Sequence, residues 1–124
     1  MFFIGPSGMK FVSAGDLAAH GFDKTDFTQD GGWHDLVVTG SVPVGTKLSI
    51  WRFNCKCATA GFTCVIRPKG YSNEINVLDL MLLVANKSTY ETFAMVLPAN
   101  NTLEYKFAST AWDTLNLTPV GWFL

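Results

Sequence analysis

Charged residues are scarce in this sequence of 124 residues, since Asp, Glu, Lys and Arg together make up 15% of it. Ordinary globular domains contain about 25%. The formal net charge is −1, and the nine basic residues are scattered singly, so no basic stripe could follow a phosphate backbone. We therefore expect no nucleic-acid partner. Hydrophobic residues make up 48% of the chain, so we expect some apolar surface to meet another chain.

Long hydrophobic runs are also lacking. The longest, residues 78–85, is interrupted by Asp79 and is far shorter than the ~20 residues that span a bilayer. The beginning, "MFFIGPSGMKF", has no basic region before an apolar block, and Gly5 and Pro6 interrupt it early. We expect no export signal and no membrane association.

Catalytic motifs are absent: the sequence contains no G-x-S-x-G, H-E-x-x-H, P-loop or G-x-G-x-x-G pattern. Of the two histidines, His20 and His34, only His34 has an adjacent carboxylate, Asp35 in "GWHDL". Neighbouring side chains of a strand point to opposite faces, so this pair predicts no acid–base site. We expect no enzymatic activity and no cofactor.

The three cysteines are too few for a structural zinc site, which needs four ligands, and neither histidine has a zinc-finger spacing to them. We expect no metal. A hairpin of residues 46–57 and 62–67 around "ATAG" would place Cys55 opposite Cys64, within disulfide distance, and Cys57 opposite Phe62. In a reducing cytosol the same thiols would pack as small hydrophobic groups, so a Cys55–Cys64 disulfide and free thiols are both open.

Strand-like segments follow one another regularly from Trp33 onward, each bounded by Gly, Pro, Asn or Ser. In "TLEYKF" apolar Leu103, Tyr105 and Phe107 alternate with charged residues, which is the period of a half-buried strand. The predicted strands span residues 33–39, 46–57, 62–67, 75–84, 90–97, 103–109 and 114–123. Seven short strands indicate an all-β sandwich or barrel. Because residues 75–84 are apolar on both faces, that strand should lie centrally in a sheet or beneath a partner chain.

The first 32 residues have no such period and form the predicted N-terminal arm, which precedes a sandwich domain of residues 33–124. A short helix is expected from Ser13 as N-cap to about His20, ended by Gly21. The phenylalanines of this arm are too widely spaced to share one helix face. They are Phe2, Phe3, Phe11, Phe22 and Phe27. They could anchor an extended arm on a partner surface, or the arm could fold back on its own sandwich.

Four tryptophans raise the alternative of glycan binding, because aromatic faces stack on sugar rings. Core packing is the default for a large aromatic side chain and suits Trp51, which shares a face with Phe53. Trp112, in the turn-like "STAWDT", is the best candidate for exposure and for a glycan contact.

From Gly32 onward the sequence resembles a β-sandwich module found in virion proteins of tailed bacteriophages. The resemblance covers roughly residues 32–124 and depends on the order and spacing of several short elements. These are W-H-D-L at 33–36, P-x-G at 43–45, R-x-x-G-x-S-N at 67–73, E-Y-K at 104–106 and G-W at 121–122.

This resemblance implies a jelly-roll-like β-sandwich with a structural role and no catalysis. The family includes capsid decoration (cement) proteins, which bridge neighbouring major capsid subunits and stabilise the icosahedral head. It also includes modules attached to tails or fibres. One module behind a phenylalanine-bearing arm, with no shaft repeat before Trp33, favours a decoration protein, made in the host cytoplasm and located on the capsid surface. The alternative is a glycan-binding tail or fibre-associated adhesin.

Closed symmetry at sites where three capsid subunits meet predicts a homotrimer. The apolar stretch 78–84 and the terminal "VGWFL" supply surface for self-association. The expected contacts within the trimer are Leu80, Leu82, Trp122 and Phe123. The expected contacts with the major capsid protein are Phe2, Phe3 and Phe11.

Overall fold

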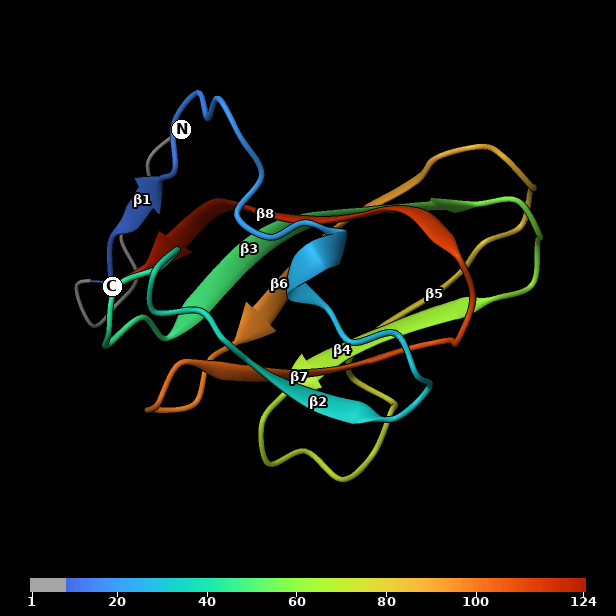
Figure 1. Ribbon diagram of the computed structural model, residues 1–124. Helices are drawn as coiled ribbons and strands as arrows, with labels where there is room; N and C mark the ends of the chain where they lie inside the picture. Colours follow the sequence, from blue (N-terminus) through green and yellow to red (C-terminus); the bar gives the residue numbers. More distant parts are fainter. Residues whose placement is uncertain (1–8) are drawn as a thin grey trace.

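The structure is a computed structural model that describes residues 9–124, so the predictions for Phe2 and Phe3 lie outside the described residues. Two antiparallel four-stranded sheets face each other (Figure 1). One contains, in spatial order, β1 (Phe11–Ser13), β8 (Trp112–Phe123), β3 (Leu48–Cys57) and β6 (Thr89–Val96), and is called the β8–β3 sheet. The other, the β7–β4 sheet, contains β2 (Trp33–Val37), β7 (Thr102–Phe107), β4 (Thr63–Pro68) and β5 (Leu78–Met81). The predicted all-β sandwich is confirmed.

Side chains that alternate along the strands meet between the two sheets and form one core. In β7 the predicted period holds, because Leu103, Tyr105 and Phe107 are buried and the residues between them are partly exposed. Trp51 and Phe53 of β3 are fully buried opposite them. The two sheets therefore stabilise each other through their inner faces.

Successive strands mostly belong to different sheets. Among the strands of residues 9–124, only β4 and β5 are neighbours both in sequence and within a sheet. The hairpin predicted for residues 46–57 and 62–67 is therefore wrong: β3 pairs with β8 and β6, whereas β4 pairs with β7 and β5. Both edges of β3 are already occupied, so the chain crosses to the opposite sheet after Cys57. Gly61, with φ of +97°, supports the reversal of direction in this connection.

The part of the arm that the structure describes folds back on the sandwich, one of the two arrangements that the sequence left open. Phe22 exchanges backbone hydrogen bonds of 2.9 Å with Leu117, and Phe27 is 5% exposed within the core. The ring of Phe27 lies 5.0 Å from Tyr105 and 4.9 Å from Phe107, centroid to centroid.

The helix predicted from Ser13 to His20 does not form. Ser13 is the last residue of β1, and its side chain accepts a 3.0 Å bond from the Gly15 N–H, an interaction that competes with a helical turn. Gly15 has φ of +80°, in the left-handed region. The only helical turn in residues 9–124 is the 3-10 turn η1 (Lys24–Asp26), capped by Asp23.

The strand predicted at residues 75–84 is shorter and differently placed. β5 spans only Leu78–Met81 and lies at the edge of the β7–β4 sheet, so of the two positions expected for it the central one is wrong, and a position beneath a partner chain stays a prediction. Ile75, which precedes it, is 93% exposed. Among the described residues, no helix has the length and hydropathy needed to cross a membrane.

Candidate interaction surfaces

One end of the outer face of the β8–β3 sheet is apolar. Because Trp51 and Phe53 point into the core, the alternate residues of β3 point outward. Their neighbours on β6 and β8 follow from the register, in which Leu48 lies beside Val96 and Phe123. We call this surface the apolar patch; its members are Phe11, Leu48, Ile50, Ala94, Val96 and Phe123. Val96 is 53% exposed, so the patch reaches solvent at the β6 side.

Phe11, an expected contact with the capsid protein, forms one side of this patch. Its ring centroid lies 5.3 Å from that of Phe123, and the ring also covers Gly121. A Cβ atom at Gly121 would lie 2.5 Å from Phe11 Cε1 and 2.7 Å from the Val12 carbonyl oxygen. Glycine at position 121 therefore permits β1 to approach β8 closely. Phe11 is partly buried, so it is already docked on its own sandwich and shares one surface with Phe123.

The expected trimer contacts are distributed differently. Leu82 is completely buried, and its N–H donates to the Phe62 carbonyl oxygen at 2.9 Å, so it has no surface to offer to a second chain. Leu80 and Trp122 are partly buried and pack against the core. The exposed apolar side chains of this stretch are instead Met81 (47%), Leu83 (76%) and Val84 (56%), which we call the β5–β6 loop patch.

Trp112 is not an exposed aromatic platform. It is the first residue of β8 and is 3% exposed, with its ring packed edge-on against Phe62 at 6.4 Å. Its Nε1–H donates to the Ala108 carbonyl oxygen at 2.9 Å. The glycan contact expected at Trp112 is therefore wrong, because the turn before it buries the ring at one end of the core.

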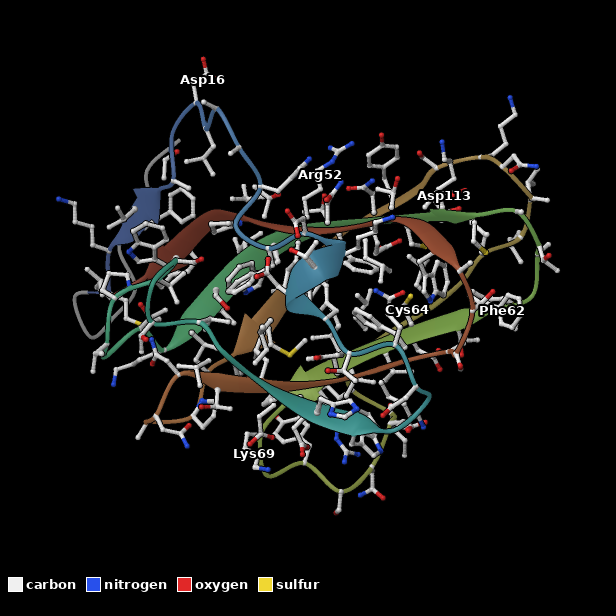
Figure 2. The ribbon with its side chains drawn as sticks, in the orientation of Figure 1. Asp16, Arg52, Phe62, Cys64, Lys69 and Asp113 are labelled. Atoms are coloured by element: carbon white, nitrogen blue, oxygen red, sulfur yellow. The ribbon has the colours of Figure 1, made fainter. Side chains whose placement is uncertain are left out.

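The other half of the same outer face is polar. Arg52 projects from β3 away from the sandwich, and its guanidinium lies 4.7 Å from the centre of the Tyr90 ring (Figure 2). No carboxylate within residues 9–124 forms an ion pair with Arg52. His20 Nδ1 lies 2.6 Å from Thr118 Oγ1, beside a shallow hollow of about 250 Å³ that Arg52 also lines.

The outer face of the β7–β4 sheet carries a network of paired charges. The ring of Trp33 lies between Arg67, at 3.6 Å from its centre, and Lys106, at 4.8 Å. Arg67 Nε donates to Glu104 at 3.0 Å, and both side chains are largely shielded.

Two further ion pairs join this network to the loop of residues 69–77. Lys106 Nζ donates to Glu74 at 2.7 Å, and Lys69 Nζ donates to Asp35 at 2.9 Å. The hydrogen bond to Asp35 raises the pKa of Lys69 above its usual value. Lys69 and Glu74 belong to the loop of residues 69–77, so these ion pairs hold the loop on the sheet.

His34 and Asp35 have different partners, in keeping with their opposite faces. His34 Nε2 lies 2.8 Å from Asp30 Oδ1 on one side, and Asp35 pairs with Lys69 on the other. The hydrogen bond to His34 lowers the pKa of Asp30.

All three cysteines are buried free thiols. Although β3 and β4 do not form a hairpin, the thiols of Cys55 and Cys64 lie close to each other across the two sheets, and Figure 2 places Cys64 between the layers. Burial raises the pKa of the Cys64 thiol well above its usual value. The described part of the chain has no group of three or more His, Cys, Asp and Glu side chains that could hold a metal ion.

Comparison with known proteins adds no relative: no protein family matches the sequence, and neither does any curated protein. The sequence reasoning did not identify the Trp33 network or the β5–β6 loop patch. For Trp33 a signal existed, because the alternation in "TLEYKF" puts Lys106 on the wet face of its strand. The sequence does not show that Trp33 lies opposite Lys106, because that contact requires β2 to pair with β7.

Proposed function

We propose that this protein is a structural virion protein that decorates an icosahedral phage head and stabilises it by bridging neighbouring major capsid subunits. The observation that carries the proposal is the apolar patch, which places Phe11 of the arm and Phe123 of β8 on one surface. The strand order of the two sheets is compatible with the jelly-roll topology expected from the resemblance. A sandwich that leaves an apolar end uncovered suits a role as an adhesive between subunits.

The energy available from such a contact is adequate for decoration. Burial of apolar surface contributes ~25 cal/mol per Å², so several hundred Å² on each subunit would contribute several kcal/mol before the cost of association. A specific stable interface buries on the order of 1,000 Å² or more in total. Repetition over the many equivalent sites of a shell supplies the remaining stabilisation.

The expected shell-docking and trimer surfaces coincide at Phe11 and Phe123, so one surface cannot serve both partners. We assign the apolar patch to the major capsid protein. The homotrimer would then use the β5–β6 loop patch, because Leu80 packs against the core. Buried Leu82 takes no part.

A pair of matched variants tests the proposal. Val96→Glu puts a charge into the apolar patch, and Val37→Glu puts the same charge at an equally exposed site on β2, since the two valines are 53% and 58% exposed. Purified heads that lack this protein should bind the wild type and the Val37→Glu variant. Val96→Glu should bind at least about tenfold more weakly, because a buried unpaired charge costs several kcal/mol.

The measurement is co-sedimentation with heads, accompanied by far-UV circular dichroism of each variant. The proposal fails if wild-type protein does not bind heads, or if Val96→Glu binds them as the wild type does. Cryo-electron microscopy of the source virion would locate the protein directly on the head, on the tail or on neither.

A glycan-binding tail module is the second candidate, now supported by the Arg52–Tyr90 pair instead of Trp112. An exposed aromatic ring beside an unpaired guanidinium suits an acidic sugar, which offers a stacking face and a carboxylate. Under this alternative, Tyr90→Ala should abolish binding on a glycan array without loss of fold. Under the decoration proposal the wild type binds no glycan.

A further inference from the structure

The strand β6 has one unpaired edge along its whole length. Its eight residues, Thr89–Val96, pair with β3 in an unbroken register, and no other described strand lies on its far side. The sequence "TYETFAMV" contains no Pro, Gly or Lys, and its register shows no bulge. Pro, Lys and bulges are among the devices by which natural proteins block edge strands. The one charged residue of β6 is Glu91, so the edge is open to a strand that carries the opposite charge beside it.

The backbone groups at this edge belong to alternate residues. The Leu97 N–H donates to the Lys47 carbonyl oxygen at 3.1 Å, which directs the backbone groups of the odd-numbered residues toward β3. In an antiparallel ladder the intervening residues then direct theirs to the opposite side. The N–H and C=O groups of Thr92, Ala94 and Val96 therefore face the free edge.

A groove lies beside this edge, where the sandwich is open between β6 and β5. Its volume is about 300 Å³, and its lining includes Leu78, Asp79, Leu80, Glu91, Phe93 and Ala94. Glu91 lies beside Phe53 and so belongs to the inner face of β6, and its carboxylate forms no ion pair within residues 9–124. The outward side chains next to the same edge, Ala94 and Val96, belong to the apolar patch.

We propose that this edge and groove bind an extended segment of a protein partner that adds to the β8–β3 sheet as a further strand. The alternating side chains of that strand meet two different environments. Those on the inner face enter the groove, where a Lys or Arg side chain pairs with Glu91. Those on the outer face are apolar and continue the patch at Ala94 and Val96. Backbone hydrogen bonds supply the affinity, and these two rows supply the specificity.

A second copy of this chain is a poorer occupant of the same edge. Its β6 has no basic residue, and it would bring another Glu91 to the groove. Like charges placed together in an interface disfavour the pairing. A partner strand with one basic side chain is attracted to the same groove, because its charge is opposite to that of the carboxylate there.

Fluorescence anisotropy with a synthetic strand tests the proposal on the full chain. The probe is a fluorescein-labelled nine-residue peptide of alternating threonine and valine, with lysine at its central position on the threonine face. Saturable binding to the wild type is expected. A peptide with glutamate in place of lysine should bind at least about tenfold more weakly, equivalent to about 1.4 kcal/mol. Glu91→Lys should reverse the preference between the two peptides.

Two variants at position 94 separate the backbone contribution from that of the side chain. Ala94→Pro removes an N–H that faces the free edge and leaves the ladder with β3 intact, so peptide binding should fall at least about tenfold. Ala94→Ser keeps the N–H and should bind as the wild type does. Thermal unfolding of each variant shows whether the fold is retained, and Glu91→Lys, an exposed substitution, tests the groove if Ala94→Pro does not fold.

Three results would overturn the proposal. They are the absence of saturable binding to the wild type, equal binding of the lysine and glutamate peptides, and unchanged binding by a folded Ala94→Pro variant. Sedimentation velocity supplies a fourth: a concentration-dependent dimer that Ala94→Pro abolishes would identify a second copy as the occupant. Glu91→Lys distinguishes this edge from the proposed function, because Glu91 lies outside the apolar patch: the variant should change the peptide preference and decorate heads as the wild type does.

Discussion

Replacement of Gly121 by alanine should release β1 from the sandwich. The added Cβ would lie 2.7 Å from the Val12 carbonyl oxygen and 2.5 Å from Phe11 Cε1, where ordinary contacts begin at 3.4 Å. The aromatic ring alone could turn aside, but the carbonyl oxygen belongs to the backbone of β1. The strand must therefore move away from β8 by most of an ångström, which is enough to break its short ladder.

The expected loss of stability is small, because β1 is a terminal strand of three residues. Full burial of a phenylalanine contributes ~1.5–3 kcal/mol, and Phe11 is only partly buried. The free energy of unfolding in urea should thus fall by about 1–2 kcal/mol. The local effect should be much larger: the amides that join β1 to β8 should lose their protection from hydrogen exchange.

Three backbone hydrogen bonds report this release. They run from Lys10 N to Leu124 O at 3.2 Å, from Leu124 N to Lys10 O at 3.0 Å, and from Ala14 N to Val120 O at 2.9 Å. Gly40→Ala is the matched control, because no atom lies within 4 Å of a Cβ at that position and the φ of Gly40 is not left-handed. Unchanged protection of these amides in Gly121→Ala would refute the reasoning, as would an equal loss in Gly40→Ala.

Three further predictions concern the core and the titrating groups. Trp112→Ala should lower the free energy of unfolding by about 3–5 kcal/mol, as for other buried aromatic residues, and a loss in urea unfolding below about 1 kcal/mol would show an exposed ring. Because the pKa of Asp30 is lowered in the fold, its contribution is present above its ordinary pKa of about 4 and is lost as pH falls through the lowered value. The difference in melting temperature between wild type and Asp30→Asn should therefore shrink from pH 6 to about pH 2.5, and a constant difference would contradict this. Burial raises the pKa of Cys64, so iodoacetamide at pH 8 should leave this thiol unlabelled in the native protein and label it in urea, as mass spectrometry would show.

Local patterns in the sequence were sufficient for the fold class and for most strands from Trp33 onward, but they missed β1 and overextended β5. Alternation at Leu103, Tyr105 and Phe107 reports which side chains face a core, and this depends only on the two-residue period of an extended chain. Gly, Pro and Asn mark the ends of strands because their backbone preferences are intrinsic. The same local reasoning failed at Ser13, where a side chain that can cap a helix bonds instead to the turn that follows β1.

The sequence by itself thus determined that the chain forms short strands with one apolar side, and that few charges cover its surface. Tertiary structure alone decided which strands are neighbours. That choice put β5 at an edge, brought Cys55 and Cys64 together across two sheets instead of along a hairpin, and buried Trp112. The physical reason is that a strand carries the same hydrogen-bonding groups on both edges, so its partners are selected by packing among residues far apart in the chain. The open edge of β6 and the patch beside it result from that selection, and no local pattern marks them.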